Sequence, residues 1–313
     1  MSKNTQILQA FERQRFNPMN DVAFKFIFGK EERKQITIDF LNAVLQESLG
    51  HEIRDITFRQ TEIPPDADDG KLSRLDIACE LDTGELVDVE VQVVNYNDMQ
   101  RRTLFYWARL YLLSLSRGEG YRVLRTAITI NLLAFELLPQ SEPVAMYSIY
   151  NPKTGDRLNK DMELHFIELP KYMKAPPKKI GELSKMERWL AYFANKLTDL
   201  EREELAMSEP AIKEAMEAEK LFLCNPDEYL RYVNRQMAIM DYRSSLQAAA
   251  EEGEARGEAR GEARGEARGE ARGESRVTRL MSLLLEAGKI EEAREASNNE
   301  AARKRLFKKY RIE

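Results

Sequence analysis

The chain has 313 residues, enough for one sizeable hydrophobic core with an appended module. Its only cysteines, Cys79 and Cys224, lie far apart, which excludes a disulfide framework and a CxxC metal site. No apolar run approaches the ~18 residues of a membrane span, and the N-terminus lacks the apolar stretch of a signal peptide, so we expect a cytoplasmic protein that does not enter a membrane. The net charge of −5 excludes a uniformly basic surface, and any contact with nucleic acid must come from local charge.

The first element in chain order is a helix predicted over residues 21–49. Apolar residues recur there at helical spacing, with an interruption near Gly29. Asp21 follows an Asn-Pro turn and is either the N-cap of this helix or an acid that the helix carries toward a site. A strand predicted over residues 53–60 comes next, followed by a proline-rich loop.

Two alternating runs, residues 74–80 and 86–92, predict a β-hairpin. The apolar residues of one run lie opposite the apolar residues of the other only if the loop has three residues and Gly84 takes a positive φ angle. The core side of the hairpin then pairs Leu75 with Val91, Ile77 with Val89 and Cys79 with Val87.

On the other side of this hairpin, Asp76 lies directly across from Glu90. Their Cβ atoms would be roughly 5 Å apart, so the two acids repel each other unless a cation lies between them. A divalent metal ion suits this position, because Mg²⁺ and Mn²⁺ prefer hard oxygen ligands. Gln92 shares the same side, whereas Asp88 lies one pleat away and is expected to face solvent.

A long helix predicted over residues 98–116 follows the hairpin, and three strands are predicted at about 122–135, 145–150 and 163–169. The buried stripe of the helix is expected to contain Leu104, Trp107, Leu110 and Tyr111. Residues 97–125 hold six arginines against two acids, and residues 302–313 hold six Lys or Arg against one Glu. We expect a phosphate backbone to contact these two basic segments.

The hairpin acids also resemble a known family. Asp76 in one strand and Glu90-X-Gln92 in the next resemble the PD-(D/E)XK nuclease core, with Gln92 in place of the usual lysine. Residues 17–29 (NPMNDVAFKFIFG) resemble the opening of the Rpn family of recombination-promoting nucleases, also described as putative transposases. The same order continues through residues 101–111, 120–121 and 127–133, so the resemblance covers about residues 16–170.

The resemblance implies a restriction-endonuclease-like α/β core, a mixed central sheet flanked by helices, with a helical C-terminal region after it. It implies an Mg²⁺-dependent (or Mn²⁺-dependent) endodeoxyribonuclease that cleaves or nicks DNA and promotes recombination. Asp76, Glu90 and the backbone carbonyl of Val91 would bind the metal. Gln92 would hydrogen-bond a water without adding charge, and Asp21 is a further catalytic candidate. Lys25, one turn after Asp21, would either reach the same site or be solvated.

The partner implied is duplex DNA. Arg102 and Tyr106 lie one helical turn apart and would either contact phosphate or extend over the core. Arg101 and Arg109 of the same helix complete the expected DNA-binding set.

From residue 183 onward the pattern is helical, and we expect four parts: a nuclease domain (1–180), a helical region (181–250), a tetrad repeat (251–276) and a basic helical tail (277–313). Residues 253–276 are six Gly-Glu-Ala-Arg tetrads, the last with Ser for Ala. In a helix, like charges would meet at i,i+4, and six glycines would cost on the order of 5 kcal/mol relative to alanine. The repeat is therefore either a long helix, which pairing with another chain would stabilise, or a solvated linker.

The tail has apolar residues at helical spacing from residue 277, a stop at Gly288 and a second helical start at Ile290. It would form a dimerisation hairpin, a helix-turn-helix or a partly disordered segment. We expect the C-terminal helices to assemble the chain as a homo-oligomer.

Three classes of function follow from these features. The first is the metal-dependent DNA endonuclease. The second is a nucleic-acid-binding protein with a degenerate active site, which the neutral Gln92 favours. The third is a helical interaction protein in which residues 183–313 dominate.

Overall fold

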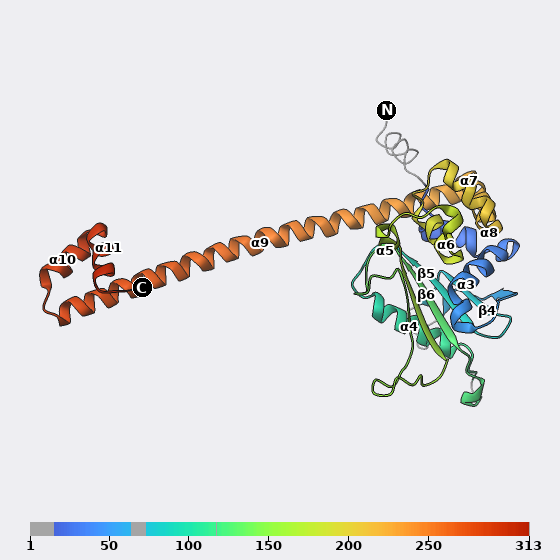
Figure 1. Ribbon diagram of the computed structural model, residues 1–313, viewed down its shortest axis with the longest axis horizontal. Coiled ribbons are helices and arrows are strands. Elements are labelled where there is room, and N and C mark those ends of the chain that lie inside the picture. Colours follow the sequence, from blue (N-terminus) through green and yellow to red (C-terminus); the bar gives the residue numbers. More distant parts are fainter. Residues whose placement is uncertain (1–15, 64–72, 117, 313) are drawn as a thin grey trace. The chain divides into compact units, whose positions relative to one another are not determined.

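The computed structural model describes residues 16–63, 73–116 and 118–312 (Figure 1). It divides into two compact units, the first up to Asp241 and the second from Tyr242 onward. None of the described helices combines the length and the apolar character that crossing a bilayer requires.

The predicted helix over 21–49 is present as α2 (Asp21–Phe28) and α3 (Lys34–Leu49), separated by a 3₁₀ turn (Glu31–Arg33). The interruption falls at Gly29, where a Cβ would lie 2.8 Å from the carbonyl oxygen of Lys25. The N-cap of α2 is Asn20, whose side chain accepts the N–H groups of Val22 and Ala23. The N-cap alternative for Asp21 was therefore wrong, and Asp21 is the first residue of the helix.

A mixed sheet of six strands forms the centre of the first unit, in the order β1-β4-β5-β6-β8-β7. Strands β5, β6 and β8 run parallel, and the other neighbours pair antiparallel, so the predicted fold class is confirmed. The six strands are β1 (Ile56–Phe58), β4 (Ile77–Leu81), β5 (Leu86–Gln92), β6 (Ala127–Leu133), β7 (Val144–Tyr147) and β8 (Met162–Glu168), and a separate pair is formed by β2 (Glu62–Ile63) and β3 (Ser73–Arg74).

Strand β1 is shorter than the strand predicted over 53–60. The backbone of Ile53 is bound by the side chain of Asn42, which accepts its N–H at 2.8 Å and donates to its carbonyl at 2.9 Å. These bonds take the place of the hydrogen bonds that Ile53 would form with a neighbouring strand, so β1 begins only at Ile56.

The predicted hairpin register is confirmed between β4 and β5. Ile77 pairs with Val89 and Cys79 with Val87, and Gly84 has a φ of +100° in the loop. Leu75 is the exception, because the chain bends at Asp76 before β4 begins. Its side chain packs with residues of the opposite face, namely Ala78, Leu86, Leu110 and Ala127.

Both faces of this sheet are covered by helices. Helices α2, α3, α6 (Lys185–Ala194), α7 (Asp199–Ser208) and α8 (Pro210–Leu223) share one core with the odd-numbered residues of β5. Helix α4 (Met99–Leu112) covers the other face. Its buried residues are Met99, Thr103 and Leu110, whereas Leu104, expected on the buried stripe, is 47% exposed.

The helices after residue 180 complete the core of the first unit. Helix α6 packs on α3, and α8 packs on both α2 and α3, while the short α5 (Leu169–Lys174) links β8 to them. The predicted division of the chain at residue 180 stays a prediction.

The tetrad repeat is helical and lies within α9 (Pro226–Glu286). Every residue of the six tetrads except Arg276 is exposed. Of the two alternatives for the repeat, the structure therefore has the helix.

The second unit ends in a helical cluster. Helix α9 stops before Gly288, which has a φ of +70°, and α10 (Ile290–Asn298) and α11 (Glu300–Lys309) follow, as the predicted stop and start require. Leu280 and Leu284 of α9 pack with Ala296 and Leu306. The tail is thus an ordered helical cluster, and its capacity to dimerise stays a prediction.

We predict that Gly84→Ala destabilises the protein by about 1–2 kcal/mol, because an L-residue strains the left-handed backbone that the hairpin loop needs. The free energy of unfolding in urea measures this effect. Gly181→Ala is the matched control, since Gly181 has ordinary φ and open space around it. Equal stability of the two variants would contradict the role given to Gly84.

Candidate active site

Asp76 lies at the bend that precedes β4. Its Oδ1 is 2.9 Å from Nζ of Lys25 on α2, and its Oδ2 accepts the N–H of Val91 at 3.0 Å. The carboxylate is therefore fixed between the first helix and strand β5.

Glu90 lies on β5 beside Asp76. Its Oε1 accepts the backbone N–H of Asp76 at 3.0 Å, and its Oε2 lies 3.3 Å from Nη2 of Arg102 on α4. The hydrogen bonds of Asp76 and Glu90 interlock, so the structure brings together the two acids expected across the hairpin.

Each of the two acids has its own protein cation, Lys25 for Asp76 and Arg102 for Glu90. Burial raises the pKa of Asp76 and raises that of Glu90 to about 8, and the Asp76 charge adds to the shift of Glu90. Lys25 and Arg102 oppose these shifts, because each favours the ionised form of its partner. Of the two alternatives for Lys25, the structure has the one in which it reaches the site.

Gln92 is the last residue of β5 and follows Glu90 on the same face of the strand. Its Oε1 lies 3.4 Å from Nη1 of Arg102, and its Nε2 donates to the carbonyl of Val94 at 3.1 Å. Gln92 therefore orients Arg102 without adding charge.

In a β-strand, the N–H and the C=O of one residue point toward the same neighbouring strand. The carbonyl of Val91 therefore points to the same side of β5 as its N–H. That N–H points to Asp76, whereas the carbonyl of Gln92 points the other way, to Ala134. The carbonyl of Val91 thus lies on the Asp76 side, as a metal ligand there requires.

Asp88 is the residue that sequence reasoning misplaced. It was expected to face solvent, but it is fully buried, because α4 covers this face of the sheet. Neither carboxyl oxygen has a hydrogen-bond partner among the described residues, and burial raises its pKa well above the usual range. Burial without a hydrogen-bond partner therefore favours the neutral form of this acid.

Asp21 lies one helical turn before Lys25 and pairs with Arg235 of α9 at 2.9 Å. Its charge still contributes to the raised pKa of Asp76. The catalytic role of Asp21 stays a prediction.

The four expected DNA contacts on α4 differ in exposure. Arg101 is exposed, whereas Arg102, Tyr106 and Arg109 are half-buried. Arg102 lies over the ring of Tyr106 at 5.1 Å and points to Glu90, so its first role is inside the site. DNA contact by these residues stays a prediction.

The donor set fits a magnesium-type ion. Among the described residues, no group of three or more His, Cys, Asp or Glu side chains could hold a metal. Mg²⁺ does not need such a group, because it usually keeps several waters and uses one or two carboxylates. Asp76, Glu90 and the carbonyl of Val91 supply that many oxygens.

A sequence model of the PD-(D/E)XK nuclease family transposases matches residues 18–249. The chain belongs to this family. The match runs from the turn before α2 into α9 and includes both acids, Lys25 and Arg102, so the expected family is confirmed. No curated protein and no solved structure is detectably similar to the chain.

We predict that Asp88→Asn weakens the pH dependence of stability. In the unfolded chain this carboxyl ionises near pH 4, at about 3.9, while the folded protein keeps its proton to higher pH. The native state then binds more protons, so wild-type stability falls as pH rises above about 4, by at most about 1.4 kcal/mol per pH unit for this group.

Urea unfolding between pH 5 and pH 8 in EDTA measures this difference, and the variant should lose less stability than the wild type. Asp82→Asn, at an exposed carboxyl of the hairpin loop, is the control and should follow the wild-type curve. An Asp88→Asn curve parallel to the wild type would show that Asp88 is ionised in the folded protein.

Proposed function

We propose that this protein is a metal-dependent endonuclease that nicks or cleaves duplex DNA. One observation carries the proposal: Asp76 and Glu90 lie interlocked where β5 ends and β4 begins, each held against a cation from a different helix. Membership of a nuclease family of transposases supports the reaction class. Promotion of recombination is part of the proposal, because strand breaks initiate it.

The metal ligands would be the carboxylates of Asp76 and Glu90 and the carbonyl of Val91. When bound, Mg²⁺ or Mn²⁺ supplies a water of lowered pKa and stabilises the charge that develops on the scissile phosphate.

Lys25 takes the part that the usual lysine of the motif plays. Gln92 occupies that motif position but is neutral, whereas Nζ of Lys25 lies 2.9 Å from Asp76. An ammonium there stabilises negative charge on a phosphate brought to Asp76. Gln92 holds Arg102 in place and can hydrogen-bond the attacking water.

The DNA-binding surface in this proposal begins at α4. Arg101 is exposed beside the site and would contact the phosphate backbone of duplex DNA, with Arg109 and Tyr106 farther along the helix. Such contacts are independent of base sequence.

A binding protein without catalysis is the second candidate. The amide of Gln92 is already engaged by Arg102 and Val94, which favours a structural role for this position.

We predict that Asp76→Ala and Glu90→Ala each reduce nicking of supercoiled plasmid to the level of an EDTA control. Each change removes an anionic oxygen donor to the metal. Glu142→Ala, at an exposed acid outside the site, should nick like the wild type. Nicking by either site variant at the wild-type rate would reject the assignment of the metal site to these two acids.

Gln92→Lys separates the two candidates within the same assay. If residue 92 is equivalent to the lysine of the motif, the Gln92→Lys variant should nick plasmid as fast as the wild type or faster. A wild type that binds the plasmid but does not nick it with either Mg²⁺ or Mn²⁺ would favour the binding protein.

We also propose that the C-terminal helices assemble the chain. In the repeat, Glu meets Glu and Arg meets Arg at i,i+4, so an isolated helix leaves like charges adjacent. Pairing with a second copy would let glutamates of one helix approach arginines of the other.

We therefore predict that deleting residues 253–313 converts a dimer to a monomer, measured by light scattering. The truncated protein should bind DNA more weakly, because it loses the basic tail and avidity, yet keep metal-dependent nicking at high protein concentration. An unchanged oligomeric state would contradict the assembly role.

A further inference from the structure

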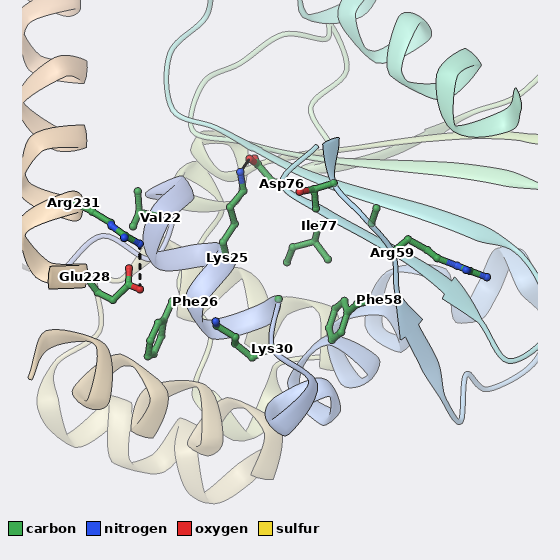
Figure 2. A pocket seen from close by; sticks show the side chains of 13 residues that line it. Val22, Lys25, Phe26, Lys30, Phe58, Arg59, Asp76, Ile77, Glu228 and Arg231 are labelled. Carbon is green, nitrogen blue, oxygen red and sulfur yellow. Dashed lines mark ion pairs between the residues drawn. The ribbon is translucent and has the colours of Figure 1, made fainter. Parts of the chain in front are cut away.

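A cavity of about 400 Å³ opens beside the Lys25–Asp76 ion pair. Its walls come from α2 and the two residues after it, the end of β1 and the segment that follows, the start of β4 and the first turns of α9 (Figure 2). The volume lies in the range of sites for small molecules, which runs from roughly 300 to 1,000 Å³. Asp76 lines both this cavity and the proposed catalytic centre.

The apolar part of the wall presents an aromatic ring. Phe58, the last residue of β1, is partly buried: it packs against the main core, and the rest of its side chain lines the cavity. Among the described residues, no other ring and no cation stacks on it. Phe26 also lines it, but the guanidinium of Arg33 already covers that ring at 4.7 Å. Phe58 is therefore the ring on which a flat ligand can stack.

The polar part of the wall is mostly cationic. Lys30 is exposed at the rim and has no ion pair within the described part of the chain. Arg231 is also at the rim, with its side chain 69% exposed and a loose pair to Glu228 at 3.6 Å. Unlike Lys25 and Asp76, Lys30 has its charge available for a ligand anion.

We propose that this cavity binds one unpaired nucleotide of the substrate strand, next to the phosphate that is cleaved. The inference rests on the proposed nuclease function. The base stacks on Phe58, and Lys30 and Arg231 contact its phosphate. A flat, apolar-faced ring joined to an anion matches a cavity that combines one open aromatic ring with cations at its rim.

The proposal gives the site a substrate class. A base inside the cavity cannot remain stacked or paired in the duplex, so DNA that already has an unpaired nucleotide avoids the free-energy cost of extrusion. DNA with a bulge is therefore bound more tightly than fully paired DNA.

Binding to two 30-base-pair duplexes tests this, one fully paired and one with a single unpaired adenosine. With the full chain in EDTA, no strand is cut and fluorescence anisotropy reports affinity alone. We expect about tenfold tighter binding of the bulged duplex, a factor within the range of one base–aromatic stack.

Phe58→Leu keeps an apolar side chain without an aromatic face, and Lys30→Ala removes the rim charge. Each should reduce the preference to below about threefold. Lys213→Ala, at an exposed lysine of α8, is the matched control and should retain the full preference. If Phe58→Leu fails to fold by circular dichroism, Lys30→Ala decides, because its side chain lies outside the core.

Equal affinity of the wild type for the two duplexes, or an unchanged preference in Lys30→Ala, would overturn the proposal. The result is independent of catalysis. A bulge preference without plasmid nicking would reject the endonuclease and keep the cavity as a nucleotide site, whereas nicking without any preference would do the reverse.

Discussion

The burial of acidic side chains on one face of β5 is the constraint on which the site depends. Asp88 and Glu90 point to the same face and are almost completely covered by protein. A buried carboxylate is costly unless it is neutralised or paired. Both responses are present, because burial favours the neutral form of Asp88, whereas Glu90, whose pKa burial also raises, lies against Arg102.

The two cations of the site come from different layers of the fold. Lys25 belongs to α2, which packs in the core on one face of the sheet, and Arg102 belongs to α4 on the other. Asp76 and Glu90 therefore lie where both helical layers reach the same strand ends, the start of β4 and the end of β5. Because the hydrogen bonds of the two acids interlock, a movement of either helix would alter the charge balance of both.

The hairpin and its register could be predicted from the sequence, because alternation and Gly84 allow only one loop length. The exposure of Asp88 and Leu104 could not. A strand pattern shows which residues share a face, but it does not show that a second helix covers that face. For the same reason the contact of Lys25 with the site was only one of two alternatives. The pairing of Arg102 with Glu90 was not predicted, because Arg102 was expected to contact phosphate or extend over the core. The N-cap depended on a choice between neighbouring Asn20 and Asp21, which local pattern alone leaves undecided.

The attachment of α2 has a consequence for synthesis. The helix that carries Lys25 is tied by the Asp21–Arg235 pair and by the bond from Asn17 to Tyr232, partners more than 200 positions apart. At roughly 5–20 residues per second, ribosomes need about 10–40 s to reach those partners after making α2. All strands of the central sheet are made within this interval, before these two ties on α2 can form. In a growing chain, the helix that carries Lys25 therefore lacks these two contacts until the first unit is almost fully translated.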